Sequence, residues 1–334
     1  MARRKRPAAR EAAFFDRFRS AIARLPAGLI RALPPAEPEA LARAEAALGR
    51  PLPDAFTSFL RSFDGADLFH ESVVIAGVGP GAPRALTELP QERADELVFA
   101  EALSGDFYAL DAAGRVLRFD PGAEERAIAG STFDRWLDAT VAREQLLFGP
   151  DGEYAADVFD PAGQEVVPTI ALRQAERALK LDPGAADSEH ARGLALARLG
   201  RRDAALAAFE AASALDPGNP WPPFDLGRTA LAMNKPAIAL PAFRRAASAA
   251  NDGATTARLL AWAVRAAVAA EDDSVATLRA EAIAKDAQLV EHLTRSASAA
   301  GEDADEEARD EAIALLEAVA PGTSVPRRLP VIPH

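Results

Sequence analysis

The sequence contains no cysteine, only four histidines and no long apolar run, and each absence excludes a class of function. Without cysteine there can be no disulfide, no thiolate zinc site and no cysteine nucleophile, and we expect a reducing compartment such as the cytoplasm. No stretch of about 18 apolar residues is present, which argues against a membrane span. Because 50 Asp and Glu outnumber 38 Lys and Arg, the net charge of −12 argues against a general nucleic-acid binder.

The 334 residues suffice for two domains with cores of their own. The first ten residues are basic, and we expect a flexible tail there (Arg3, Arg4, Lys5, Arg6 and Arg10). No apolar segment of secretory type follows this tail, so it does not resemble an export signal. The next residues predict a short amphipathic helix, which could touch a membrane surface but is expected to pack on its own domain (Phe14, Phe15, Phe18, Ile22 and Leu25).

Residues 44–68 organise the first half of the chain. Gly49 stands where a helix C-cap favours a positive φ, and Pro51 prevents the helix from continuing. Pro53 suits the first turn of a second helix, which ends at Asp64-Gly65. The apolar residues of this second helix recur at i, i+3, i+4 and i+7, which predicts one buried face (Phe56, Phe59, Leu60 and Phe63).

This stretch resembles the SUKH superfamily, the Smi/Knr-like proteins, whose members carry a Glu-x-x-Leu-Gly-x-x-Leu-Pro-x-x-(Phe/Tyr)-x-x-Phe-Leu-x-x-x-(Asn/Asp)-Gly signature. The matching residues are Glu45, Leu48, Gly49, Leu52, Pro53, Phe56, Phe59, Leu60, Asp64 and Gly65. The resemblance implies a domain over roughly residues 14–148 in which the signature residues are mostly structural.

The rest of the first half changes to short, β-rich runs. Val73, Val74 and Ile75 predict one strand, residues 97–100 another, and residues 107–119 a hairpin around a Gly-containing loop. A last helix is expected to begin after Gly130-Ser131, with Ser131 as its N-cap. Helices, then antiparallel strands, then a helix predict an α+β domain, which we place at residues 11–149.

Two segments of this domain could be mistaken for ligand sites. The glycine-rich residues 77–81 lack a Gly-Lys-Ser/Thr sequence and a following helix, so a plain loop is favoured over a phosphate loop. Asp67, His70 and Glu71 could share a metal in principle, but their spacing is weak evidence and solvated loop residues are commoner. We therefore assign no catalytic, cofactor-binding or metal-binding residue.

After a segment at residues 150–168 that could be a hairpin or an extended strap, a 34-residue repeat begins near Thr169. Leu181-Asp182-Pro183-Gly184 recurs 34 residues later as Leu215-Asp216-Pro217-Gly218, and Ala208-Phe209 recurs as Ala242-Phe243. This is the tetratricopeptide period, and the sequence resembles that family. The resemblance rests on two sets of small, aromatic and breaker positions (Gly193, Ala205, Phe209, Ala212 and Pro217; Leu226, Gly227, Ala239, Phe243 and Ala246).

We expect two good repeats flanked by imperfect ones across residues 169–300, forming an all-α solenoid. The acidic residues 302–311 lead into an apolar segment, which predicts a terminal capping helix at residues 301–320 and a loose tail at 321–334. If the repeats stack normally, the family's spacing implies a partner-binding groove with seven residues on or near its surface (His190, Leu194, Arg198, Trp221, Phe224, Arg228 and Leu231). The alternative is that Trp221 and Phe224 pack against the adjacent repeat.

Three functions are weighed. SUKH domains in bacteria are often associated with immunity, so the resemblance implies a protein that neutralises a toxin, and the acidity would suit a basic nuclease partner. Yeast members are implicated in cell-wall regulation, which implies instead an intracellular adaptor or scaffold with two linked binding modules. An enzyme is disfavoured because no nucleophile motif, cofactor loop or telling carboxylate pair is found. The expected partner is a protein or peptide, and the oligomeric state stays open.

Overall fold

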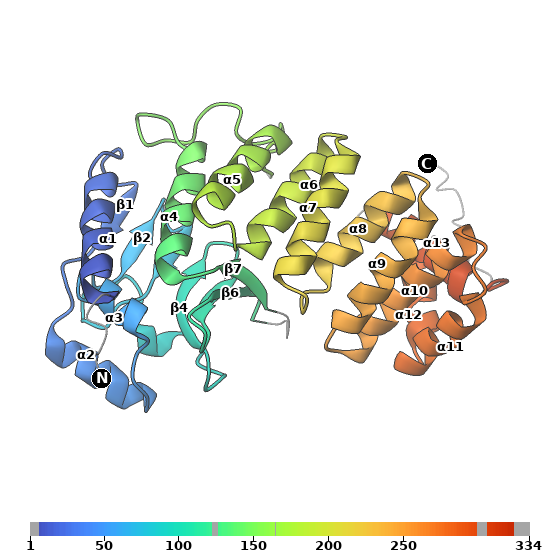
Figure 1. The fold of residues 1–334 in the computed structure, drawn as a ribbon, viewed down its shortest axis with the longest axis horizontal. Helices are drawn as coiled ribbons and strands as arrows, with labels where there is room; N and C mark the ends of the chain where they lie inside the picture. Colours follow the sequence, from blue (N-terminus) through green and yellow to red (C-terminus); the bar gives the residue numbers. More distant parts are fainter. Residues whose placement is uncertain (1–6, 122–125, 164, 299–305, 324–334) are drawn as a thin grey trace, which may run out of the picture. The chain divides into compact units, whose positions relative to one another are not determined.

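The computed structural model describes residues 7–121, 126–163, 165–298 and 306–323. Its chain divides into two compact units, Met1–Arg201 and Arg202–His334. The first unit contains an antiparallel sheet with helices and the second contains helices, so the predicted succession of an α+β domain and an all-α helical array is confirmed (Figure 1).

The sheet of the first unit has seven antiparallel strands whose spatial order is their chain order. Every strand therefore pairs with its sequence neighbour, as short connections favour. The predicted hairpin is present, with Leu110 opposite Val116. The strands are β1 (Ile30–Ala32), β2 (Ala66–Leu68), β3 (Val73–Ile75), β4 (Leu97–Ala102), β5 (Phe107–Leu110), β6 (Val116–Phe119) and β7 (Ala127–Gly130).

Helices of the first unit pack on each other and on the sheet. An aromatic core joins α3 (Asp54–Leu60), β4 and α4 (Phe133–Glu144), because Phe59 lies 5.4 Å from Phe133 and Phe99 lies 5.1 Å from Trp136 between ring centroids. The predicted apolar stripe on α3 is thus the centre of the core. The other elements are α1 (Pro7–Ile22), α2 (Pro38–Leu48), α5 (Pro168–Leu181), α6 (Ala186–Arg198) and the short 3₁₀ turns η1 (Leu86–Glu88) and η2 (Gln145–Leu147).

Two expectations about helix ends need correction. The N-cap of α4 is Thr132 and not Ser131, and no side chain caps that helix end. Ser131 instead donates its backbone N–H and its hydroxyl to the carboxylate of Asp182, at 2.7 and 2.6 Å. At the N-terminus, α1 begins at Pro7, inside the stretch expected to be a tail, whereas residues 1–6 with their four basic side chains lie outside the described residues.

The segment between the sheet and the repeats forms two tight loops. One is closed by an antiparallel bridge between Phe148 and Tyr154, and the other by a bridge between Phe159 and Val166. Phe148 and Tyr154 also stack with their rings 4.6 Å apart. The segment therefore folds back on itself twice between the sheet and α5. It continues into α5 and α6, which belong to the same compact unit as the sheet.

The second unit consists of helices that pack on their neighbours along the chain. α7 begins at Arg202 and α9 at Pro236, which reproduces the 34-residue period of the sequence. Gly227 is needed where helices approach, because a Cβ there would lie 2.6 Å from Cε1 of Phe243. The helices are α7 (Arg202–Leu215), α8 (Trp221–Ala232), α9 (Pro236–Ala249), α10 (Gly253–Ala269), α11 (Val275–Lys285), α12 (Leu289–Ser298) and α13 (Glu306–Val319).

α13 corresponds to the predicted terminal helix, and its apolar face is buried by Leu315, Leu316 and Val319. α12 was not predicted, although its buried residues Leu289 and Leu293 are four apart, as a helix requires. α10 starts at a cap that does use a side chain, because Asp252 accepts a hydrogen bond from the Thr255 N–H at 2.8 Å.

Candidate functional site

The two acidic signature residues of the first unit, Glu45 and Asp64, bind backbone N–H groups of the same domain. The carboxylate of Asp64, which follows α3, is buried and accepts hydrogen bonds from the backbone N–H groups of Val78 at 2.7 Å and Gly79 at 2.9 Å. At the other end of the signature, Glu45 accepts a hydrogen bond from the Leu52 N–H at 3.0 Å. Each acid thus satisfies backbone donors within the domain, which is a structural role.

The Asp64 contact gives the glycine-rich loop its function in the fold. A Cβ at Gly77 would lie 2.4 Å from the Asp64 carbonyl oxygen, and one at Gly79 would lie 2.3 Å from Asp64 Oδ2. The two glycines are therefore required so that the loop can reach the carboxylate closely. The loop binds an internal carboxylate with the N–H groups that a phosphate loop would offer to a ligand.

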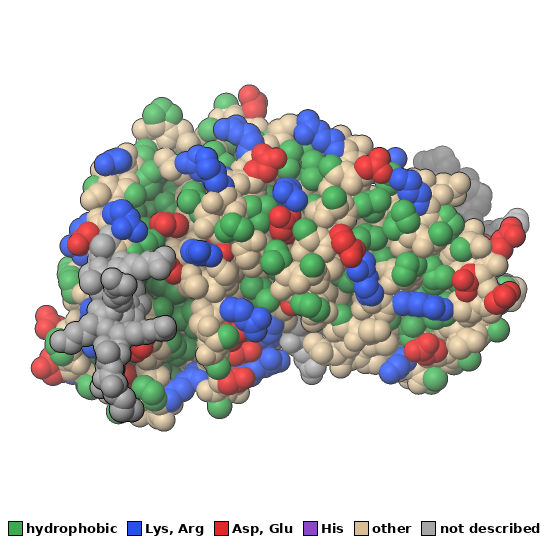
Figure 2. Space-filling model, viewed as in Figure 1, with side chains coloured by type: hydrophobic (Ala, Val, Ile, Leu, Met, Phe, Trp, Pro, Cys, Tyr) green, Lys and Arg blue, Asp and Glu red, His purple; other side chains and the backbone are tan. Residues whose placement is uncertain are grey.

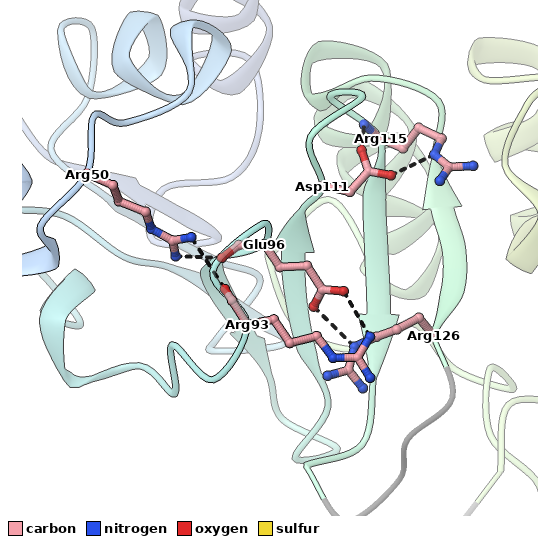
Figure 3. A network of polar contacts seen from close by, with 6 residues as sticks. All are labelled: Arg50, Arg93, Glu96, Asp111, Arg115 and Arg126. Carbon is pink, nitrogen blue, oxygen red and sulfur yellow. Dashed lines mark hydrogen bonds and ion pairs between the residues drawn. The ribbon is translucent and has the colours of Figure 1, made fainter. Parts of the chain in front are cut away.

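A second group of charged side chains surrounds Glu96 (Figure 3). Arg93 and Arg126 reach the two carboxylate oxygens of Glu96, each at 3.3 Å. Arg50, which follows α2, donates to the Glu96 carbonyl at 2.5 Å and to Gln91 Oε1 at 2.9 Å. These contacts hold the segment before β4 against the helices, and the buried carboxylate is neutralised by its arginines.

Asp67, His70 and Glu71, which were considered as metal ligands, belong to a turn that is closed by a hydrogen bond. Asp67 Oδ1 accepts a hydrogen bond from the Glu71 N–H at 2.8 Å, within a turn where Phe69, His70 and Glu71 all have positive φ. Among the residues that the structure describes, no group of three or more His, Asp and Glu side chains could hold a metal ion.

The seven predicted groove residues fall in both units. In the first unit, α6 carries His190, Leu194 and Arg198; Leu194 is exposed, and Arg198 pairs with Glu165 at 2.9 Å. In the second unit, α8 carries the other four, of which Leu231 is partly buried against the core of that unit. The two sets lie in different units, so a continuous groove stays a prediction.

Three of the α8 residues line a pocket of about 310 Å³ inside the second unit, here called the aromatic–arginine pocket. Its walls come from α8, α10 and α13. Trp221 is 41% exposed, whereas Trp262 is buried. The lining residues are Trp221, Phe224, Arg228, Thr255, Arg258, Leu259, Trp262 and Glu311.

The rings of this pocket are in contact, edge to face. Phe224 lies 5.9 Å from Trp221 and 5.7 Å from Trp262, both in T-shaped geometry. The guanidinium of Arg228 lies 5.8 Å from the rings of Phe224 and of Trp262, and that of Arg265 lies 5.0 Å from Trp262. Arginines over aromatic faces are attracted by the ring quadrupole while their N–H groups remain able to bind carboxylates.

The packing alternative weighed for Trp221 and Phe224 holds for Phe224, whereas the binding alternative stays a prediction. Phe224 packs against Trp262 of α10, in the following repeat, at 5.7 Å, as the packing alternative requires. Trp221 keeps an exposed edge on the pocket, as the binding alternative requires.

Three residues that line the pocket were not among the predicted groove residues, although the 34-residue period indicates them. Adding 34 to the positions of Trp221, Phe224 and Arg228 gives Thr255, Arg258 and Trp262, and all three line the same pocket. The departure of the later repeats from the family pattern hid this correspondence, because the residue types change at each position. Glu311 of α13 lies outside the repeats and had no such signal.

Comparison with known families gives a match to part of the first unit. Residues 35–139 match the SMI1 / KNR4 family (SUKH-1). The match spans α2 through most of α4, so it contains the whole signature and the Asp64 loop of the SUKH domain. The resemblance inferred from the signature is thereby confirmed for this part of the chain.

Comparison with solved structures gives matches of low identity and low TM-score. A structure described as "Crystal structure of MamA" has a TM-score of 0.33 and 17% identity, over 46% of this chain and 86% of that one. One described as "Crystal structure of YrrB: a TPR protein with an unusual peptide-binding site" has 0.32 and 20%, over 46% and 76%. "MamA 41-end from Desulfovibrio magneticus RS-1" has 0.32 and 19%, over 47% and 88%. Comparison with curated proteins gives no match.

Within the described ranges, no helix combines the length and the apolar character that crossing a membrane would require.

Proposed function

We propose that this is a non-enzymatic protein-binding protein whose second unit binds a peptide segment of its partner in the aromatic–arginine pocket. The observation that carries the proposal is the half-exposed Trp221 beside Phe224, with Arg228 over the neighbouring ring. Tryptophan and arginine dominate the binding energy of protein interfaces, particularly where rings are pre-packed and lose little entropy on binding.

The pocket favours a segment with apolar and acidic side chains. Arg228 and Arg258 each keep a large exposed fraction, at 42% and 62% of their side chains. A guanidinium presents a planar fork that matches a carboxylate, and the ring edges of Trp221 and Phe224 offer apolar contact. An acidic segment with an apolar or aromatic residue would satisfy both parts.

For the partner itself we propose a toxin that the chain neutralises in the cytoplasm. Two properties support this: the SUKH domain at residues 35–139 and the net charge of −12. An acidic protein attracts a basic partner over long distances, while the local arginines of the pocket would hold an acidic segment of it at short range. On the face shown in Figure 2, basic and acidic side chains are interspersed, so steering would come from the summed charge and not from one patch on that face.

The test is an affinity pull-down from native lysate with the full chain, read by mass spectrometry. The Trp221→Ala/Arg228→Gln variant should lose the partner that binds the second unit. A matched control is Ile238→Ala/Arg295→Gln, which removes an exposed apolar side chain and an exposed arginine outside the pocket and should retain it. Equal recovery by both variants would argue against binding in the pocket.

The identity of the partner decides between the two functions. A toxin encoded nearby, whose toxicity is relieved when the full chain is co-expressed, supports immunity. Recovery of several housekeeping proteins, with no rescue from any toxin, supports the adaptor instead.

A further inference from the structure

The two arginines at the rim of the aromatic–arginine pocket already have carboxylate partners within the second unit. Arg258 Nη2 lies 2.9 Å from Glu311 Oε1, and Arg228 Nη2 lies 3.5 Å from Glu307 Oε1. Both acids belong to α13 and are four residues apart, so they lie one turn apart on the same face of that helix. Glu311 also lines the pocket and is only 16% exposed, which places a charge of the chain itself where a ligand carboxylate would bind.

The rest of α13 is fixed by contacts that do not involve the pocket. Leu315 and Leu316 are buried in the core of the second unit, and Arg279 donates to the Ala318 carbonyl at 2.7 Å. The helix is therefore anchored through its C-terminal half. Glu307 is 85% exposed, so its side chain can leave Arg228 by rotating, while the helix stays in place.

We propose that Glu307 and Glu311 are internal competitors for the acidic segment of the partner, so that α13 regulates access to Arg228 and Arg258. This inference rests on the proposed function and adds the chemistry of the ligand. The preferred segment is helical and carries two carboxylates four residues apart, because that spacing is the one by which α13 reaches both arginines. An apolar side chain between them would face Trp221 and Phe224.

The competition is modest in strength. Both pairs are weak, because Arg228 and Arg258 are 42% and 62% exposed and water and salt screen them. The internal pairs therefore lower the affinity for an acidic segment without abolishing it. Removing both should raise that affinity by about two- to tenfold, which is the fold-change that such weak pairs can cost a competing ligand.

The experiment measures the binding of a defined probe to the full chain by fluorescence anisotropy. The probe is a fluorescein-labelled, Ala-rich helical peptide with two glutamates four residues apart and a phenylalanine between them. Its control has glutamine in place of both glutamates. Glu307→Gln/Glu311→Gln should bind the probe about two- to tenfold tighter than the wild type, and Arg228→Gln/Arg258→Gln should bind it much more weakly.

A matched control separates local competition from overall charge. Asp310→Asn/Glu317→Gln removes two charges from the same helix, but both residues are exposed and neither lines the pocket. It should leave the affinity near that of the wild type. Circular dichroism melting of each variant verifies that α13 remains folded.

The outcomes distinguish this inference from the function on which it rests. If the arginine variant loses the probe but Glu307→Gln/Glu311→Gln binds no tighter than Asp310→Asn/Glu317→Gln, the pocket takes acidic segments and the internal competition is disproved. If no variant binds the probe better than the glutamine control peptide, or if the arginine variant binds as the wild type does, the pocket is not an acidic-segment site and both proposals fail.

Discussion

The carboxylate of Asp64 binds the backbone N–H of Val78 at 2.7 Å and so ties the end of the signature helix region to the loop after β3. Its second oxygen binds the Gly79 N–H at 2.9 Å. Because hydrogen bonds to a charged acceptor are strong, this one side chain fixes the conformation of the loop at Val78 and Gly79.

Replacing this carboxylate should weaken the first unit selectively. Asp64→Ala leaves two backbone N–H groups without their acceptor, and we expect a loss of about 2–4 kcal/mol in the free energy of unfolding. The measurement is urea unfolding of the full chain in a Trp221→Phe/Trp262→Phe background, where Trp136 of α4 is the remaining tryptophan and reports on the first unit. Asp95→Ala, at an exposed site, should change the midpoint little; a similar shift for both would contradict the structural role of Asp64.

The glycines of the same loop give a second prediction. Gly79→Ala should destabilise the first unit by about 2–3 kcal/mol, because its Cβ would displace the Asp64 carboxylate that lies 2.3 Å away. Gly81→Ala is the control, since nothing lies within 4 Å of its Cβ. In an Asp64→Ala background the cost of Gly79→Ala should largely vanish, and a cost that persists there would mean that the loop backbone, and not the carboxylate, requires glycine.

How far these features can be predicted depends on how local they are. The signature, the hairpin and the helical stripe of Phe56 and Phe59 follow from spacings of a few residues, and the structure contains each of them. The Asp64 loop could not be predicted, because a carboxylate gives no sign of which distant N–H group it will accept. Equally, Ser131 is of a residue type that favours the N-cap position, but it hydrogen-bonds to the buried Asp182, and Thr132 is the N-cap residue of α4.

The candidate site shows the same limit. Trp221, Phe224 and Arg228 were predicted on one surface from the spacing of the repeat family, and they line one pocket. The 34-residue period also indicates Arg258 and Trp262, since stacked repeats present equivalent positions side by side. Glu311 belongs to a helix outside the repeats, so only the folded chain shows that it meets Arg258. The repeat period therefore predicts which residues of α8 and α10 share a surface, but it gives no information about α13, which is not part of a repeat.

The stability of the first unit should depend on pH through Asp138 on α4. Burial, and then the neighbouring charge of Asp134, raises the pKa of Asp138 from 3.8 to about 6. A carboxyl whose pKa is raised on folding stabilises the fold while it is protonated, and this contribution is lost as the pH rises through about 6. Asp138→Asn keeps the side chain neutral, so it should raise the melting temperature at pH 8 and change it little near pH 4.

The measurement is thermal unfolding of the wild type and Asp138→Asn from about pH 4 to 8, followed by Trp136 fluorescence in the background above. Asp95→Asn serves as the control for removing one negative charge at an exposed position. An Asp138→Asn profile parallel to that of the wild type across this range would show that Asp138 titrates near its ordinary pKa.

The last prediction concerns how α5 and α6 are joined to the sheet within the first unit. Asp182 follows α5, is fully buried, and accepts both the N–H and the hydroxyl of Ser131. Asp182→Ala should therefore cost about 2–4 kcal/mol, since it removes two charge-assisted hydrogen bonds and leaves a backbone donor unpaired. Ser131→Ala removes only the hydroxyl and retains the backbone bond, so it should cost less than half as much.

Both losses are read as midpoints of the Trp136 transition, and the double variant completes the cycle. Because the two residues share one contact, Asp182→Ala/Ser131→Ala should be scarcely less stable than Asp182→Ala alone. Strict additivity would mean that the carboxylate stabilises its own Pro-Gly turn, where it also accepts the Gly184 N–H at 3.2 Å, and not the junction with the sheet. The predicted non-additivity instead makes the Asp182–Ser131 contact one that holds α5 and α6 to the SUKH domain, beside the Arg118–Asp187 ion pair at 3.0 Å.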